Sequence, residues 1–410
     1  MAAFTFIFVE MGQGDCTLVQ CPDGRVVVVD CGSTNAKEAN DKYWIQAYLQ
    51  LRTWTRTRSN KIDALILTHP DADHHNQVVT FFQALTWSGN VTLPDGTVLT
   101  KPAGGKVDID TIYVSNAVSD TSPLGHYTGA ALNTNVYSHY FNTSTVYEVT
   151  SNTTKSKGNV LKRWTKASNF GTLAGTQSIT GNKVNVLSGG TGAQSWSIDI
   201  LAGNVPGGYG KVKDLATEDN ARSLITLFTM GTRKVLLCGD ATLSTEKFLL
   251  DAHAATISDV DLIMVPHHGS AYASGWDFVK KTNPSAGVVS VGFLEHSFRL
   301  PRYSILERWL ETIEKKGATI ADHDIDYWEL IDFDEVDEQY NKWVASSQKV
   351  AWNDSKTFCY LLNPGNKAFA LYKLQKAGMW LYRETVNSPL TMTSQKTQVY
   401  QLSSAGVSLQ

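Results

Sequence analysis

Residues 66–75 constrain this chain most, because they end an apolar run with a dense group of metal-binding side chains. The run 64–67 reads as a buried strand. The side chains that follow it are His69, Asp71, Asp73, His74 and His75. In extended backbone His69, Asp71 and Asp73 alternate and would point the same way. Imidazoles and carboxylates at a strand end suit one or two divalent cations, so the segment predicts a metal site. A solvated, Asp-rich turn is the alternative.

Three other segments place similar groups after apolar runs. Asp30 ends a Val-rich run, where it could bind a metal, orient a metal-binding histidine or form a turn. Asp240 follows the run 236–238 and is our candidate for a carboxylate that bridges two ions, although a helix N-cap is also compatible. His267 and His268 follow the run 261–265, and either could be the ligand. A pair at a strand end is hard to explain as structural in a chain with ten histidines.

The composition is that of an ordinary globular protein, and it excludes several classes. With 410 residues, 42% of them hydrophobic, the chain can build a large core without needing a metal to fold. No apolar run approaches the length of a membrane span, so we expect no membrane partner. A net charge of −3 gives no overall signature of nucleic-acid binding. The sequence does not indicate which proteins, if any, bind this chain.

The cysteine content and the N-terminus bear on location. Five cysteines are an odd and sparse set, which argues against a disulfide framework and fits a reducing compartment. Residues 1–10 lack a basic segment before their apolar run and read as a first strand rather than a signal peptide. We therefore predict a cytoplasmic protein.

The chain reads as two β-rich halves, each with helices. The predicted strands are 4–9, 16–20, 26–30, 65–68, 197–201, 223–229, 234–238, 261–265 and 287–291, and the predicted helices include 39–52, 77–85, 244–253 and 303–315. Two such halves suggest two sheets packed face to face with helices outside. We assign this two-sheet domain to residues 1–319.

Two segments stand outside this pattern. Residues 86–195 are rich in Ser, Thr, Asn and Gly and too long for a simple loop, so we interpret them as an insertion with short strands of its own over the site. The insertion carries a basic cluster: Lys155, Lys157, Lys162, Arg163 and Lys166. It could contact an anionic substrate or be a solvated face. Residues 320–410 read as a small C-terminal β extension.

The motifs together resemble a known superfamily. His-Pro-Asp-Ala-Asp-His at 69–74, Gly-Asp-Ala at 239–241 and Val-Pro-His-His-Gly-Ser at 265–270 look like the metallo-β-lactamase superfamily. More narrowly, residues 11–15, 29–32 and 220–224 resemble the hydrolase domain of the ComEC/Rec2 DNA-uptake proteins and their free-standing relatives. The resemblance runs from residue 11 to about 310, interrupted by the insertion.

The resemblance implies an α/β fold, a four-layer αββα sandwich (the metallo-β-lactamase fold) with an inserted polar segment, the small C-terminal β extension and a site at the common edge of the sheets. It also sorts the ligands: Asp73, His74, the shared Asp240 and one of His267 and His268 for one ion, His69 and Asp240 for the other. The common superfamily pattern has histidines where Asp71 stands and near Asn220. The site is therefore harder, which favours Mn²⁺ or Mg²⁺ alongside Zn²⁺, as one or two ions.

The implied reaction is metal-assisted hydrolysis. A bound cation lowers the pKa of its water and supplies hydroxide near neutral pH. Asp71 or Asp73 could orient that water, and His296 could serve as an acid or phosphate contact where the subgroup carries Gly-His-Pro. We expect a phosphodiesterase or nuclease that acts on nucleic acid or a nucleotide. The alternatives are hydrolysis of another ester, a lactone or an amide, or a non-enzymatic module with a degenerate metal site.

Overall fold

The structure is a computed structural model of the chain. It describes residues 2–33, 54–55, 61–78, 89–92, 98–101, 107–115, 141–142, 145–153, 159–165, 172–179, 181–291, 300–301, 303–315, 330–331, 349–352, 358–363, 368–375, 378–384, 390–392 and 397–410. Several predictions fall outside these residues: the helix at 39–52, most of the helix at 77–85, His296 and the cluster members Lys155, Lys157 and Lys166.

The first sheet carries most of the N-terminal half. Its strands are β1 (Phe4–Phe8), β2 (Thr17–Gln20), β3 (Val26–Val29), β4 (Lys61–Leu67), β7 (Val107–Val114), β8 (Phe141–Asn142), β9 (Thr145–Ser151), β10 (Asn159–Thr165), β11 (Thr172–Ser178), β24 (Gln398–Ser403) and β25 (Gly406–Leu409). They run in the order β11-β10-β9-β7-β4-β3-β2-β1-β24-β25, with β8 beside β7. Strands β3, β4 and β7 are parallel, so their carboxyl ends meet at one edge.

The second sheet is built mainly from the middle of the chain. Its strands are β12 (Val184–Gly189), β13 (Trp196–Ala202), β14 (Ile225–Met230), β15 (Arg233–Leu237), β16 (Leu262–Met264), β17 (Ala286–Val289) and β23 (Leu390–Met392), in that order. Strands β15, β16 and β17 are also parallel. The carboxyl ends of both parallel sets therefore supply loops to one region.

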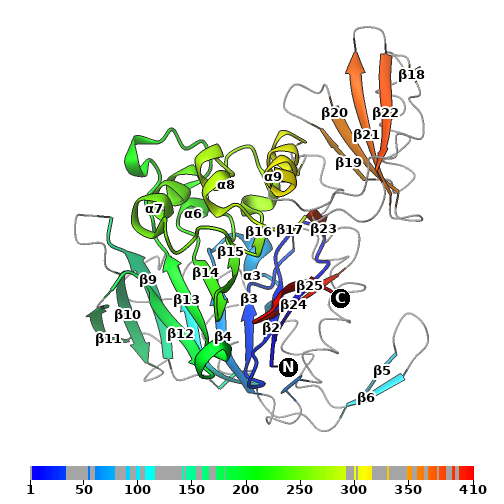
Figure 1. The fold of residues 1–410 in the computed structure, drawn as a ribbon. Coiled ribbons are helices and arrows are strands. Elements are labelled where there is room, and N and C mark those ends of the chain that lie inside the picture. The colour runs from blue at the N-terminus through cyan, green and yellow to red at the C-terminus, as the bar shows by residue number, and fades with distance from the viewer. Residues whose placement is uncertain are drawn as a thin grey trace.

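The two sheets pack face to face through a core of large side chains (Figure 1). Phe6 lies edge to face with Phe228 of the opposite sheet, with ring centroids 5.0 Å apart, and Phe4 meets Trp196 in the same way at 5.3 Å. Burying each ring contributes about 1.5–3 kcal/mol. This arrangement confirms the predicted α/β sandwich of two sheets.

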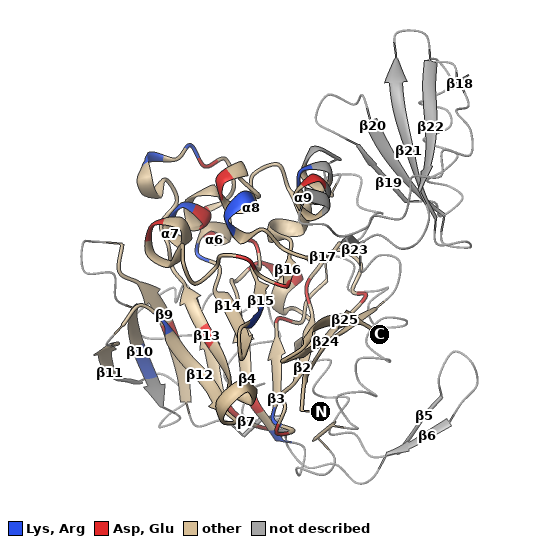
Figure 2. Ribbon diagram, viewed as in Figure 1, with Lys and Arg blue, Asp and Glu red and all other residues tan. Residues whose placement is uncertain are grey.

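Helices cover the outer face of the second sheet (Figure 1). They are α7 (Leu243–His253), α8 (Trp276–Thr282) and α9 (Tyr303–Lys315). Phe248, Phe278 and Trp309 lie in the apolar core that joins these helices to the sheet. Figure 2 shows that many of the charged residues lie on the helical layer. No helix in the described residues is long and apolar enough to cross a membrane.

The described part of the predicted insertion differs from our expectation of a separate layer over the site. Strands β7, β9, β10 and β11 extend the first sheet, and β12 extends the second. Strand β9 is mostly buried in spite of its Thr and Ser residues, and Val149 lies in the core between the two sheets. Only β5 (Gly89–Thr92) and β6 (Val98–Lys101) form a two-stranded sheet apart from the others.

The C-terminal segment also differs from a single extension. Strands β18 (Leu330–Ile331), β19 (Lys349–Trp352), β20 (Phe358–Asn363), β21 (Ala368–Gln375) and β22 (Gly378–Glu384) form a sheet of their own. Strand β23, in contrast, pairs with β17, and β24 pairs with β1 over five registered positions. The end of the chain therefore completes both sheets of the sandwich. The domain boundary at 319/320 stays a prediction.

Candidate metal centre

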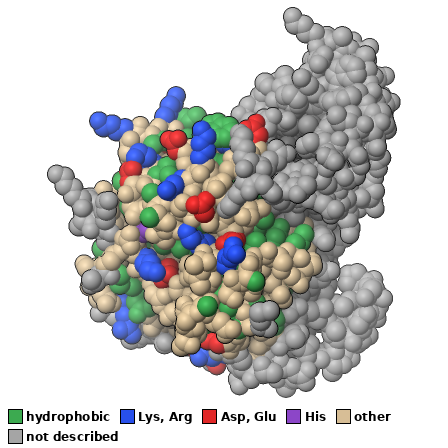
Figure 3. Space-filling model, in the orientation of Figure 1, with side chains coloured by type: hydrophobic (Ala, Val, Ile, Leu, Met, Phe, Trp, Pro, Cys, Tyr) green, Lys and Arg blue, Asp and Glu red, His purple; other side chains and the backbone are tan. Residues whose placement is uncertain are grey.

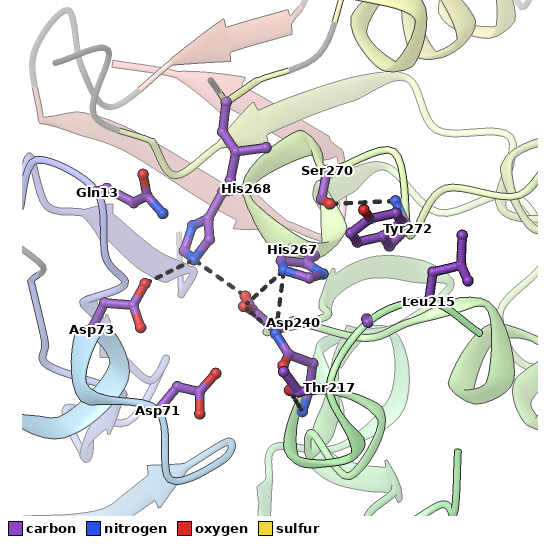
Figure 4. Close-up of a pocket in the computed structure, with 13 residues that line it drawn as sticks. Gln13, Asp71, Asp73, Leu215, Thr217, Asp240, His267, His268, Ser270 and Tyr272 are labelled. Carbon is purple, nitrogen blue, oxygen red and sulfur yellow. Dashed lines mark hydrogen bonds and ion pairs between the residues drawn. The ribbon is translucent and has the colours of Figure 1, made fainter. Parts of the chain in front are cut away.

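Loops from both sheets bring imidazoles and carboxylates together at the shared edge (Figure 4). Asp240 follows β15 and occupies the centre. Its Oδ1 lies 3.2 Å from His74 Nε2 and 3.3 Å from His268 Nε2, and its Oδ2 lies 3.7 Å from His69 Nε2. Asp73 Oδ2 lies 3.5 Å from His268 Nε2. Five predicted ligands from three separate segments thus lie close to one another: 69–74 after β4, Asp240 after β15 and His268 after β16.

His74 is oriented by a carboxylate behind it. It lies in the one-turn helix α3 (Ala72–His75), and its Nδ1 lies 2.9 Å from Asp30 Oδ2. Asp30 also accepts from the Thr68 N–H at 2.7 Å and from the Thr68 hydroxyl at 2.6 Å. Nδ1 of His74 is thus engaged by the Asp30 carboxylate, and Nε2 is left to face Asp240. Asp30, left open in the sequence analysis, is placed as the orienting residue.

His268 is oriented by backbone. The turn Pro266–Gly269 holds both His267 and His268 in the left-handed region, each with φ of 52°. This turn directs His268 Nδ1 to the Ser290 carbonyl oxygen at 2.7 Å. Nε2 of His268 is thereby left to face Asp240 and Asp73. Of the two histidines that the sequence could not separate, His268 is the one that the structure brings into the centre.

The sequence analysis did not assign Asp15, which the structure places beneath the same histidines. It is buried, and its two oxygens lie 3.7 Å from His74 Nδ1 and from His268 Nδ1. The loop that carries Gly32 passes close to the His74 backbone. Only glycine allows this approach, because a Cβ at position 32 would lie 2.4 Å from the His74 backbone nitrogen. The sequence feature that could have indicated Asp15 is a carboxylate that directly follows Gly14 after the first strand.

Several buried polar atoms at the centre have no hydrogen-bond partner among the described residues. Four of them lie where the imidazoles meet Asp240: His69 Nε2, His74 Nε2, His268 Nε2 and Asp240 Oδ1. An unsatisfied buried polar group costs about 1–3 kcal/mol. The side chains His69, His74 and Asp240 form one possible metal-binding group, and Asp73, His74 and His268 form another. Nitrogen and carboxylate donors in this arrangement fit a divalent cation.

The charges of the centre are strongly coupled. Burial opposes ionisation of Asp73, yet the neighbouring imidazoles of His268 and His74 hold its pKa at about 2. Burial likewise disfavours charged His268, but Asp240 and Asp73 outweigh it and raise its pKa to about 10. The same balance raises the pKa of His74 and lowers that of Asp240. Protons therefore occupy the imidazoles where a cation would displace them.

The other predicted site residues lie at the rim or elsewhere. His267 Nε2 lies 3.2 Å from Asn220 Nδ2 and 3.6 Å from Asp240 Oδ2. Asp71 Oδ2 lies 3.5 Å from His69 Nε2, with 39% of its side chain exposed. His75, which we had counted among the possible ligands, faces the Pro70 carbonyl oxygen at 2.9 Å.

Asn220, near which the resemblance implied a histidine, lies beside Asp240. It lies in α6 (Glu218–Ala221), whose first residue is preceded by Thr217, and the Thr217 hydroxyl caps the helix by accepting from the Asn220 N–H at 3.2 Å. The Asn220 amide donates to Asp240 Oδ2 at 3.0 Å. Asn220 therefore fixes one oxygen of Asp240 and leaves the other free.

A cavity of about 380 Å³ opens above the centre. Besides Asp71, Asp73, Asp240, His267 and His268, it is lined by Gln13, Leu215, Ala216, Thr217, Asn220, Ser270, Tyr272 and Leu300. Its size lies in the range of small-molecule sites.

The predicted basic cluster is only partly described. Lys162 and Arg163 are successive residues of β10, so their side chains leave opposite faces of the sheet. Lys162 lines a second cavity of about 370 Å³ together with Glu148 and Arg222. On the face that Figure 3 shows, Lys and Arg side chains are mixed with acids rather than gathered in one patch.

Comparison with known proteins confirms the resemblance that the motifs carry. Residues 9–86 match the family model described as Metallo-beta-lactamase superfamily. Recombination protein 2 of Haemophilus influenzae is 31% identical over 90 residues, which cover 22% of this chain and 11% of the relative. The aligned segment thus spans about a tenth of that relative's length.

Two solved structures illustrate the structural likeness. The metallo-beta-lactamase fold protein YhfI from Bacillus subtilis is 12% identical, with a TM-score of 0.34, over 70% of this chain and 85% of that one. Human tRNase Z, short form, is 10% identical, with a TM-score of 0.32, over 70% of this chain and 91% of that one.

Proposed function

We propose that this protein is a metal-dependent hydrolase that cleaves phosphodiesters. The observation that carries the proposal is the convergence of three buried imidazole nitrogens and one carboxylate oxygen, none with a hydrogen-bond partner among the described residues. Such a cluster is costly without a cation. Asp240 and His268 of this cluster line the cavity, where a bound cation would face a substrate.

Two overlapping groups of residues would hold the metal. Asp73, His74 and His268 would bind one ion and His69 a second, and Asp240 would contribute to both. A bound divalent cation supplies an acidified water and stabilises negative charge that develops on a phosphoryl oxygen. The high share of carboxylates favours Mn²⁺ or Mg²⁺ alongside Zn²⁺.

Protein groups around the centre would complete the reaction. Asp30 and the Ser290 carbonyl fix the tautomers of His74 and His268, so that the ligand atoms need no rearrangement. Asp71 projects into the cavity with a partly exposed carboxylate, which could take a proton from the attacking water. His296, the other predicted acid, lies outside the described residues and stays a prediction.

The choice of a phosphodiester rests on two supports. Paired cation sites that share a carboxylate suit the attacking and leaving oxygens of a phosphoryl displacement. The matching relative is named Recombination protein 2, which favours a nucleic-acid or nucleotide substrate. Hydrolysis of a lactone, an amide or another ester remains the second candidate, since one fold serves many reactions.

Metal analysis followed by an assay tests the proposal. The purified protein should retain a divalent cation and hydrolyse bis(4-nitrophenyl) phosphate with added Mn²⁺. Asp73→Ala and His74→Ala should each lower kcat/KM by more than about a hundredfold, because each removes a ligand. Asp251→Ala, on the exposed part of α7, is the control and should keep full activity. Bound metal without phosphodiester turnover would support the second candidate, and the absence of metal under all conditions would support a non-enzymatic module.

A further inference from the structure

Exposed apolar side chains gather at the mouth of the metal cavity. Four large hydrophobic residues are exposed among the described residues: Leu215, Tyr272, Trp276 and Leu409. Two of these, Leu215 at 62% and Tyr272 at 43% exposure, line the metal cavity. Figure 4 places them on the His267 side, opposite Asp71 and Asp73. The cavity thus has one acidic wall and one apolar wall.

The loop that carries Leu215 is anchored on both sides. Asp214 Oδ1 accepts from the Ala216 N–H at 3.2 Å, and Asp214 Oδ2 accepts from the Thr242 hydroxyl and the Ser244 N–H. Thr217 then caps α6. Leu215 is therefore held at the rim by hydrogen bonds from its neighbours. Exposing this apolar side chain to water costs free energy, and contacts within the described residues leave most of the side chain exposed.

The backbone of Tyr272 is anchored to the metal-binding turn. Its N–H donates to Ser270 Oγ at 3.3 Å, and its carbonyl oxygen accepts from the Leu243 N–H at 3.3 Å. Tyr272 follows His268 by only four residues. The backbone of Tyr272 is thus held at a fixed position relative to the metal ligands. A site that binds a phosphate and the group attached to it needs this fixed spacing.

We propose that Leu215 and Tyr272 form a subsite for the planar base of a nucleotide whose phosphate lies at the metal centre. This proposal rests on the proposed function and names its substrate class. A tyrosine ring offers a face for stacking, which is tolerant of base identity, and a leucine can cover the base edge. A long acyl chain fits less well, because the polar side chains of Gln13, Thr217 and Ser270 interrupt the apolar lining.

Two substrates with the same leaving group isolate this contact. Thymidine 5′-(4-nitrophenyl phosphate) and methyl 4-nitrophenyl phosphate both react by attack of water on phosphorus and release of 4-nitrophenolate, and only the first carries a base. Tyr272→Ala and Leu215→Ala should lower kcat/KM for the thymidine ester by roughly five- to fiftyfold, the effect of losing one stacked base. Both variants should leave the methyl ester within about twofold. Tyr272→Phe should keep the thymidine activity, and Leu409→Ala, at an exposed leucine on β25 away from the cavity, is the control.

The outcomes separate this inference from the proposed function. If the wild type hydrolyses both esters equally well and the rim variants change neither, the base subsite is refuted and the hydrolase proposal stands. If neither ester is hydrolysed, calorimetry decides the subsite by itself: thymidine 5′-monophosphate should bind more tightly than ribose 5-phosphate, and Tyr272→Ala should remove the difference. Equal binding of the two ligands would refute the subsite as well.

Discussion

His74 Nδ1 lies 2.9 Å from Asp30 Oδ2, at the back of the metal centre, and His74 Nε2 lies 3.2 Å from Asp240 Oδ1 at its front. The ring therefore links a buried carboxylate to the place where a cation would lie. The other Asp30 oxygen accepts from the Thr68 N–H. This second hydrogen bond fixes the orientation of the Asp30 carboxylate. It therefore also decides how an amide at position 30 would be oriented.

We expect Asp30→Asn to weaken metal binding about 10–100-fold. The amide oxygen must stay on the Thr68 N–H, so the new NH₂ group faces His74 Nδ1 and donates to it. The imidazole proton then moves to Nε2, which can no longer bind a cation. Isothermal titration with Mn²⁺ or Zn²⁺ measures the change. The backbone at position 30 has φ of 54°, which Asn tolerates as well as Asp.

Asp63→Asn provides the comparison, because Asp63 is also a buried strand carboxylate and accepts from the Val26 N–H at 2.8 Å. This variant should lose stability without a specific loss of metal affinity. Equal affinity losses in both variants would show that Asp30 acts only through the fold.

Metal binding should stabilise the fold. A cation at about a hundred times its Kd raises the free energy of unfolding by about 2.7 kcal/mol. Urea denaturation in Mn²⁺ and in EDTA measures this difference. Asp240→Asn should abolish it, since Asp240 contacts every imidazole of the centre. A variant that is stabilised as much as the wild type would place the bound cation elsewhere.

The stability should also depend on a buried acid outside the centre. Burial raises the pKa of Glu246 to about 8, although the N–H groups of Gly275 and Ser274 and the charge of Arg308 oppose the shift. Between pH 4.5 and 8 the folded protein holds a proton that the unfolded chain releases. The contribution of Glu246 is therefore fully present below pH 4.5 and is lost as pH rises through about 8, with a slope approaching about 1.4 kcal/mol per pH unit.

Denaturation midpoints of wild type and Glu246→Gln from pH 5 to 9 isolate this contribution. The variant is less stable at low pH, because its NH₂ group faces an N–H donor. It cannot titrate, however, so its deficit should shrink as pH rises. Curves that stay parallel across the range would mean that Glu246 is already ionised at pH 5.

The positions of three residues of the centre could be predicted from the sequence, because each follows the end of a strand. His69, Asp240 and His268 each follow an apolar run that the structure shows as a parallel strand, and parallel strands deliver their carboxyl ends to one edge. Their proximity is thus a consequence of local pattern plus sandwich packing. Their role as metal ligands stays a prediction.

Other features depend on geometry that the sequence pattern does not carry. The choice of His268 over His267 follows from left-handed backbone at both positions, and the burial of Asp15 follows from the close approach of Gly32. The pairing of β7 with β4 and of β24 with β1 joins residues far apart in sequence, where composition had indicated an insertion and an extension. Long-range pairing of this kind is decided by packing, not by local propensity.

The second cavity offers a test for polymer substrates. Lys162 and Arg222 both line it, and Arg222 is two residues beyond Asn220 of the metal centre. If a nucleic-acid strand continues from the centre past α6, its phosphates would reach these two cations. Replacing both with Ala should weaken single-stranded DNA binding and reduce the slope of log K against log salt by about 1.4, or about 0.7 per phosphate contact. Arg163→Ala, on the opposite face of β10, is the control and should leave the slope unchanged. Equal slopes for the double variant and the wild type would restrict the substrate to the cavity itself.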